Sequence, residues 1–300
     1  FVCQRAREDV KVALVGQGPD ELFGGYKRHL GVQYGGMWRR MPGWLRSSLE
    51  NGIERLPRNE TLKRGLYSLN INERMRRYQN VFSILPGDSI DSLFRPGLLP
   101  EGAGDRICEF WSDLEPEMQG TDELGGFQGL EIRSSLPDEL LMYADKLSMT
   151  HSLEVRVPYL DKEIIEYAHR LPARFKVRRG QRKWLHRRVC ETYLPKEILK
   201  RKKRGFAVDV VDSWFNDSIG GKLMDYLRDP QSRMYEFLQP ERAARLLEEH
   251  RGGRHDNHKI LFSLIVLEEW LRGSINELPS KNKVVSQHGR PSEREGGLLR

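Results

Sequence analysis

The chain has 300 residues, enough for one large domain or two small ones, and 38% of them are hydrophobic, which is ordinary for a protein with a packed core. Fifty Lys and Arg residues against 43 Asp and Glu residues give a formal net charge of +7, but the basic residues are spread along the chain, which argues against a nucleic-acid-binding arm. The longest apolar run, residues 260–267, is too short to span a bilayer, so no membrane partner is expected.

Three widely separated cysteines, Cys3, Cys108 and Cys190, have neither the spacing of zinc ligands nor that of a disulfide framework. They favour a reducing, cytoplasmic location, and the N-terminus has no signal-peptide pattern. The sequence begins without methionine, inside an expected helix over residues 1–9. We therefore expect it to be part of a longer protein.

The first informative stretch is residues 10–26, VKVALVGQGPDELFGGY. Its apolar run, residues 10–15, predicts a strand buried on both faces, as in a parallel sheet. The glycines at positions 16 and 18 let backbone N–H groups approach a ligand, and Pro19 suits the first position of a helix. That helix is expected to reach Leu30, with a weak point or a short break at Gly24 and Gly25.

Two carboxylates, Asp20 and Glu21, open this predicted helix. In open α/β sheets ligands bind beyond the carboxyl ends of the strands, where these side chains could hold Mg²⁺ against phosphate. A tight strand-to-helix turn, with acids that merely suit the helix dipole, is the alternative from these residues alone.

Residues 31–129 are predicted to form amphipathic helices interrupted by Pro and Gly, such as 44–55 and 65–79. Arg74, Arg76 and Arg77 lie in the second of these helices. A phosphate patch is one interpretation of the three arginines, but a solvated face is favoured on so polar a helix.

A further helix is predicted to begin at Pro137, since two acidic residues follow it. Helical spacing places Asp145 on a stripe with Met142 and Met149, toward a packed or functional surface. A second apolar stripe comprises residues 140, 144 and 147. From the residues alone, Asp145 and Lys146 suit an ion pair or a cap.

Residues 154–157 are predicted to be extended, with Glu154 and Arg156 on one face. Arg156 could bind phosphate or could lock Glu154 in a semi-buried pair, and the residues favour neither. Asp161 is the predicted N-cap of a helix that ends near Arg170, with Ile164, Ile165 and Ala168 facing inward.

Lys183 falls in the first turn of a predicted helix after Gly180, with residues 185, 189 and 193 facing inward. A helix dipole disfavours a cation there, and a nearby anion would remove the conflict. Helix-start N–H groups and an ammonium could bind pyrophosphate or the α-phosphate of a nucleotide, whereas an exposed lysine is the alternative. The basic, glycine-containing stretch RKKRGF, residues 201–206, follows. From the residues alone it suits a surface turn or a weak nuclear-type basic cluster.

Beyond residue 214 the sequence predicts a surface helix over 240–250 and a largely buried helix over 257–271, because apolar residues surround the latter. Residues 276–300 are polar and are predicted to be a disordered tail.

Three motifs in order, GQGPDELFGGY, SLPDELLMYADKLSMTHSLEVRVPYLD and RGQRKWLHRRV, resemble the synthetase domain of glutamine-hydrolysing asparagine synthetases over about residues 1–215. The resemblance implies an α/β, Rossmann-like fold of the adenine nucleotide alpha hydrolase type, PP-loop ATP pyrophosphatase-like, that is mostly α-helical in this chain. Residues 1–275 would form the C-terminal part of that domain.

The resemblance also implies an activity, that of an ATP- and Mg²⁺-dependent ligase in asparagine biosynthesis. Aspartate is adenylated to β-aspartyl-AMP with release of pyrophosphate, and ammonia then displaces AMP. A glutaminase domain releases the ammonia from glutamine, and the parent protein is compatible with a homodimer. Rivals are a ligase of the same fold that activates another carboxylate, β-lactam-forming or peptide-cyclising, and a non-catalytic scaffold.

The resemblance assigns roles to particular residues. Lys183 would be the catalytic lysine and Asp20 the metal ligand, and Gln17 stands where the family often has glutamate. A carboxylate there could take a proton from attacking ammonium, whereas the Gln17 carboxamide can only orient by hydrogen bonding. The residues implied in cofactor binding are Val15, Gly16, Gly18, Asp20, Glu21, Asp145, Lys146, Glu154 and Arg156.

Two expectations follow from this assignment. Asp20, Asp145, Arg156 and Lys183 should converge on one cleft. No SGGxDS-type phosphate loop and no glutaminase domain occur in the sequence, so the chain is expected to be inactive alone.

Overall fold

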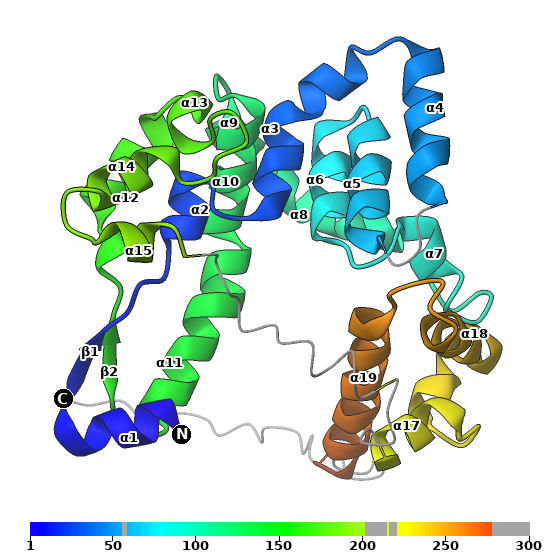
Figure 1. The fold of residues 1–300 in the computed structure, drawn as a ribbon. Helices are drawn as coiled ribbons and strands as arrows, with labels where there is room; N and C mark the ends of the chain where they lie inside the picture. Colours follow the sequence, from blue (N-terminus) through cyan, green and yellow to red (C-terminus); the bar gives the residue numbers. More distant parts are fainter. Residues whose placement is uncertain (56–58, 202–214, 216–220, 278–300) are drawn as a thin grey trace, which may run out of the picture.

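One short parallel sheet lies among helices in the computed structural model, which describes residues 1–55, 59–201, 215 and 221–277 (Figure 1). Strands β1 (Val12–Leu14) and β2 (Glu154–Arg156) pair in register, so that Val12 lies opposite Glu154 and Leu14 opposite Arg156. Both strands run the same way, so the loops that follow them leave the sheet at one edge.

The predicted strand at residues 10–15 is present, but the expectation that it is buried on both faces is wrong. Val12 and Leu14 leave 39% and 72% of their surfaces exposed. Among the described residues the sheet has two strands, and a sheet this narrow cannot bury both faces of either strand. The apolar run of β1 therefore lies open to solvent.

The helices group around three buried clusters. Helices α2 (Pro19–Phe23) and α12 (Lys162–Arg170) enclose the smallest one. The second draws on α3 (Lys27–Arg39), α6 (Arg74–Phe82), α8 (Arg106–Ser112), α9 (Glu115–Met118), α10 (Glu123–Arg133) and α13 (Ala173–Lys176). The third is formed mainly by α17 (Gly221–Arg228), α18 (Pro240–Arg251) and α19 (His258–Glu277).

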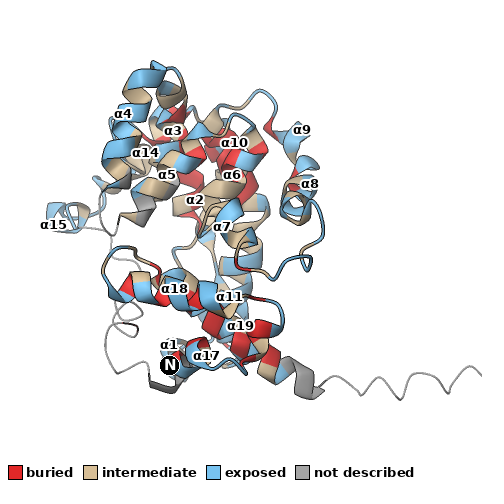
Figure 2. Ribbon diagram, turned by 90° about the vertical axis from the view of Figure 1, so that its right-hand side faces the viewer, coloured by how far each residue is buried: buried red, intermediate tan, exposed pale blue. Residues whose placement is uncertain are grey.

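The other helices contribute no residue to these three clusters within the described part of the chain. Helices α4 (Gly43–Glu54) and α15 (Lys196–Leu199) are largely exposed (Figure 2). The remaining ones are α1 (Val2–Asp9), α5 (Glu60–Asn70), α7 (Gly87–Asp91), α11 (Met142–Met149) and α14 (Trp184–Cys190). No helix in the described part of the chain is long and apolar enough to cross a membrane.

Local signals set several helix boundaries as predicted. Gly24 ends α2 in the left-handed conformation, with φ of +73°, so the expected break at the glycine pair is confirmed. Asp161 is the N-cap of α12 and accepts a hydrogen bond from the Glu163 N–H at 2.9 Å. Ala168 of this helix is fully buried.

Other predicted helices differ from the structure. The single helix expected over 65–79 is two, α5 and α6, because Glu73 caps α6 by accepting from the backbone N–H groups of Met75 and Arg76. The helix expected from Pro137 begins as a wider π-helical turn, residues 136–141, before α11. Met142 and Met149 of α11 are about half exposed, so their stripe is not a packed surface, and the alternative of a functional surface stays a prediction.

The helix predicted over residues 257–271 as largely buried is α19, and it is amphipathic instead. Leu261, Leu264 and Ile265 are buried, whereas Val266 and Trp270 expose 49% and 62% of their surfaces. Helix α19 ends at Glu277, inside the segment predicted as a tail, and residues 278–300 lie outside the described residues.

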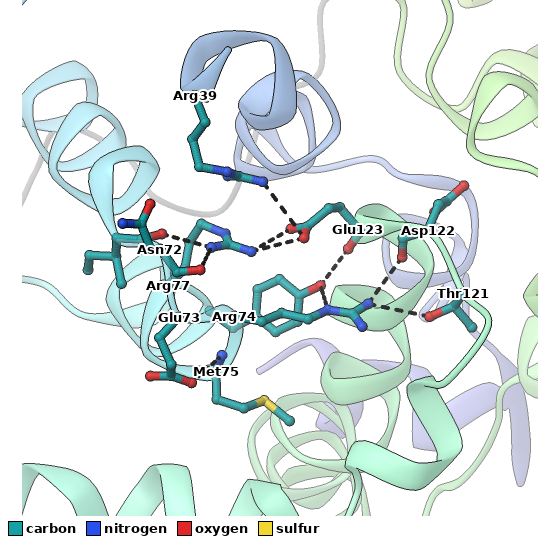
Figure 3. A network of polar contacts seen from close by, with 11 residues as sticks. Arg39, Asn72, Glu73, Arg74, Met75, Arg77, Thr121, Asp122 and Glu123 are labelled. Carbon is teal, nitrogen blue, oxygen red and sulfur yellow. Dashed lines mark hydrogen bonds and ion pairs between the residues drawn. The ribbon is translucent and has the colours of Figure 1, made fainter. Parts of the chain in front are cut away.

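The arginines of α6 were expected on a solvated face, and this is wrong for Arg77 (Figure 3). Arg77 is 5% exposed and donates to the Glu123 carboxylate at 2.9 and 3.0 Å and to the carbonyls of Ile71 and Asn72. Arg74 donates to the Tyr78 hydroxyl within α6 at 2.8 Å and to the carbonyl of Asp122, the N-cap of α10, at 3.3 Å. These guanidinium groups tie α6 to α10, a role that their own helix cannot reveal.

We expect Arg77→Ala to lower the free energy of unfolding by ~3 kcal/mol, because it leaves a carboxylate and two carbonyls without their donor. Arg76→Ala is the matched control, since the Arg76 side chain is 57% exposed and its ion pairs with Glu73 and Asp105 are at the surface, worth at most ~1 kcal/mol. Chemical denaturation of both variants gives the comparison. Equal effects would contradict the buried role of Arg77.

Candidate functional site

The loops after β1 and β2 meet at the carboxyl edge of the sheet. A Cβ atom at Gly18 would lie 2.4 Å from Leu160 Cδ2, so glycine is needed for this close approach, and its φ of +102° also favours glycine. Pro19 then starts α2, and Asp20 and Glu21 lie in its first turn.

Asp20 and Lys183 form an ion pair at this edge. Lys183 Nζ lies 3.1 Å from Asp20 Oδ1, and each side chain is 23% exposed. Lys183 is the N-cap of α14 in the left-handed conformation, with φ of +52°. The anion expected to offset a cation at this helix start is thus the Asp20 carboxylate.

The glycine pair after α2 makes room for this ion pair. A Cβ atom at Gly25 would lie 1.8 Å from Asp20 Oδ1 and 2.4 Å from Lys183 Cε. Arg182 Nη1 donates to the Gly25 carbonyl at 2.8 Å. Gly25 therefore lies directly against both members of the ion pair, Asp20 and Lys183.

Glu21 points into the interior and not toward the loops. It is 2% exposed, and its carboxylate accepts from the Tyr26 hydroxyl at 2.5 Å. Burial raises the pKa of Glu21, and the hydrogen bond from Tyr26 opposes this rise. The Glu21 carboxylate therefore lies in the core beside Tyr26, and its expected contact with a nucleotide stays a prediction.

A chain of buried polar groups continues from Glu21. The Gln128 amide donates to the Glu21 carbonyl at 2.5 Å, and Lys176 Nζ donates to Gln128 Oε1 at 2.9 Å. Lys176 is 2% exposed, and burial lowers its pKa from 10.5 to about 8, with the Asp122 charge opposing the change. Nothing in the local sequence distinguishes Lys176 from a surface lysine.

The lowered pKa of Lys176 predicts a pH dependence of stability. Between about pH 8 and 10.5 the unfolded chain keeps the lysine proton while the folded chain releases it, so the free energy of unfolding rises with pH in this window. The shift corresponds to roughly 3 kcal/mol. Relative to Lys176→Met, the natural chain should gain stability from pH 8 to pH 10 in urea denaturation, and a constant difference would contradict this.

His186 is a site residue that the sequence analysis missed. Its Nε2 atom lies 3.1 Å from the Tyr159 hydroxyl, and its ring centroid lies 5.6 Å from that of Phe23 in α2. Burial and the Lys183 charge lower the pKa of His186, while the Asp20 charge opposes them. The imidazole is therefore neutral near pH 7. Its place in a basic run, HRRV, hid this position.

The other residues expected at the phosphate loop differ in their surroundings. Gln17 Oε1 is buried and has no hydrogen-bond partner among the described residues. The Val15 N–H donates to the Arg156 carbonyl at 2.9 Å and so extends the sheet pairing. A Cβ atom at Gly16 would meet nothing within 4 Å. Gln17 thus has a buried acceptor oxygen that receives no hydrogen bond from the described residues.

Arg156 and Asp145 do not join the ion pair of Asp20 and Lys183. Arg156 Nε lies 2.8 Å from Glu154 Oε1, and the two side chains are 64% and 56% exposed, so the pair is not semi-buried. Asp145 and its neighbour Lys146 are exposed on α11. Of the four residues expected to converge, the structure brings Asp20 and Lys183 into contact. Residues 202–206 of the basic stretch lie outside the described residues.

The predicted inward positions on α14 need correction. Val189, within α14, is 53% exposed, and Tyr193, which lies beyond the end of α14 at Cys190, is 80% exposed.

No group of three His, Cys, Asp or Glu side chains within the described ranges could hold a metal ion by itself. Mg²⁺ commonly binds one or two carboxylates together with substrate phosphates. The Asp20 carboxylate fits that kind of site.

A glycine-containing loop at the carboxyl edge of parallel strands, with a carboxylate and an ammonium beside it, is typical of enzymes that bind phosphorylated ligands. The chain belongs to the asparagine synthase family, whose model matches residues 1–272. No solved structure gave a significant match.

Named relatives agree with this family. A Mycobacterium tuberculosis protein provisionally named asparagine synthetase [glutamine-hydrolyzing] is 31% identical over 272 residues, 90% of this chain and 40% of the relative. Asparagine synthetase [glutamine-hydrolyzing] 1 of Bacillus subtilis is 27% identical over 274 residues, 90% of this chain and 42% of the relative. The chain spans about two-fifths of the length of these relatives.

Proposed function

We propose that this chain forms part of the synthetase site of an enzyme that makes asparagine from aspartate and ATP through β-aspartyl-AMP. The observation that carries the proposal is the contact of Asp20 with Lys183 at the carboxyl edge of the sheet. When a nucleotide binds, the Lys183 ammonium turns from Asp20 to a phosphate oxygen. The Asp20 carboxylate would then be available to hold Mg²⁺, and that ion would supply positive charge beside the departing pyrophosphate.

Gln17 has a different part in the proposal. Its buried Oε1 atom accepts a hydrogen bond from ammonia and orients its lone pair, because a carboxamide cannot take up the proton. The backbone at residues 15, 16 and 18 lies against the phosphates. Arg156, exchanging Glu154 for a phosphate oxygen, and the exposed pair Asp145 and Lys146 complete the nucleotide contacts.

The partners belong to the same proposal. Ammonia comes from glutamine through a glutaminase domain, and an upstream SGGxDS-type segment supplies the rest of the phosphate site. The protein acts in the cytoplasm, as a homodimer, without nucleic acid or membrane. Residues 1–275 form the synthetase part and 276–300 a disordered tail.

ATP–pyrophosphate exchange by the complete synthetase tests the proposal. Exchange that depends on aspartate supports it. Exchange that depends on another acid supports a related ligase, β-lactam-forming or peptide-cyclising, and no exchange with any acid supports a non-catalytic scaffold.

We also expect the 300 residues alone to form no asparagine from aspartate, ATP and free ammonia. The sequence has no SGGxDS-type loop, and β1 exposes an apolar face that invites aggregation or pairing with another chain. Addition of the upstream segment, in trans or by fusion, should restore aspartate-dependent exchange. Equal turnover with and without that segment would show that the nucleotide binds elsewhere.

A further inference from the structure

Helix α2, which carries Asp20, is only five residues long, so its own hydrogen bonds cannot hold it in place. The backbone N–H of Gly25 bonds the Asp20 carbonyl at 2.8 Å. The next carbonyl, that of Glu21, is one of the groups that a helix end leaves without an intrahelical partner. It receives its hydrogen bond from the Gln128 amide of α10.

Gln128 is itself held by a buried charge. Lys176, at the end of α13, donates to Gln128 Oε1, and both residues are at most 2% exposed. An ammonium at the carbonyl end of an amide polarises it and strengthens the hydrogen bond that the NH₂ group donates. Core packing alone is served better by an apolar side chain, because a buried cation beside a neutral partner opposes folding.

The same segment continues to Lys183. A Cβ atom at Gly24, the C-cap of α2, would lie 2.9 Å from Val177 Cγ2, directly after Lys176. Arg182 bonds the next glycine, Gly25, and Lys183 follows. The residues from 176 to 183 thus contact α2 at one end through Gln128 and Gly24, and at the other through Asp20.

From this geometry we propose that Lys176 and Gln128 are positioning residues, which set the place of Asp20 relative to Lys183 through the Glu21 carbonyl. Both side chains are buried, so they act through the backbone of α2. Their consequence for catalysis rests on the proposed function, whereas their effect on the ion pair does not.

The sharpest variant is Gln128→Glu. It keeps an acceptor for Lys176 but replaces the NH₂ donor by an oxygen that faces the Glu21 carbonyl, so it cuts only the link to α2. Lys176→Met weakens the same link from the other side with an apolar side chain of similar length. Gln79→Glu is the matched control, because Gln79 of α6 likewise donates to a backbone carbonyl, that of Gly104 at 2.7 Å, and among the described residues has no hydrogen bond to α2.

The first measurement uses the chain itself and needs no activity. Amine acetylation, read by mass spectrometry, gives the modification rate of Lys183 relative to Lys162, whose side chain is 89% exposed. We expect several-fold faster modification of Lys183 in Gln128→Glu and in Lys176→Met, and the natural rate in Gln79→Glu, with thermal unfolding followed for each. Natural Lys183 rates in two folded site variants would overturn the proposal.

The second measurement uses the complete synthetase. Both site variants should lower kcat for aspartate-dependent exchange by about 10- to 100-fold while KM for ATP changes little, because misplacement acts on the transition state more than on binding. A purely structural role predicts natural kcat in every folded variant and would overturn the proposal. If the natural protein shows no exchange but Lys183 modification responds as expected, the proposed function fails and the positioning role stands.

Discussion

Lys183→Met is expected to lower aspartate-dependent ATP–pyrophosphate exchange by ~10²- to 10³-fold, the usual effect of removing a preorganised charge from a site where negative charge develops. Asp20→Asn should have a similar effect, because the amide keeps the shape of the side chain but loses the charge that a metal ion requires. The two side chains contact each other at 3.1 Å, so the double variant should lose little more than either single one.

Two controls frame this experiment. Lys162→Met removes an exposed lysine of α12 and should leave exchange unchanged. Glutamine hydrolysis by the complete synthetase should also persist in the Asp20 and Lys183 variants, because the proposed function assigns it to a separate glutaminase domain. Exchange at the natural rate in both single variants would exclude the ion pair from the phosphate site.

Gly25→Ala is expected to reduce exchange by ~10²-fold with little loss of stability. The added Cβ atom would meet Asp20 Oδ1 and Lys183 Cε, which are near the ends of flexible side chains. These side chains can move aside, so the fold tolerates the methyl group, but Asp20 and Lys183 are displaced from the positions at which they would meet the metal ion and the phosphate.

Gly31→Ala is the matched control, because a Cβ atom at Gly31 in α3 would meet nothing within 4 Å. Helix propensity makes that substitution neutral or stabilising by up to ~1 kcal/mol. Measurements of exchange and of thermal unfolding for both variants separate the effect on activity from the effect on stability. Natural exchange in a folded Gly25→Ala protein would show that exchange does not depend on the placement of Asp20 and Lys183 beside Gly25.

The sequence by itself determined the features that depend on residues a few positions apart. Pro19 marks the start of α2, the glycine pair marks its end, and Asp161 caps α12. The conflict between the Lys183 cation and its helix start predicted an anion, and the structure supplies Asp20. Three ordered motifs also indicated the family that the comparison shows for residues 1–272.

Only the tertiary structure decided which charges are buried and what they contact. Asp20 and Glu21 are adjacent acids in one helix turn, yet one meets Lys183 and the other enters the core beside Tyr26. Arg76 and Arg77 differ in the same way. A side chain's environment depends on segments a hundred or more residues away, such as Gln128 against Glu21, and no local pattern encodes that distance. The hydrogen bond forms only because packing brings the two helices together.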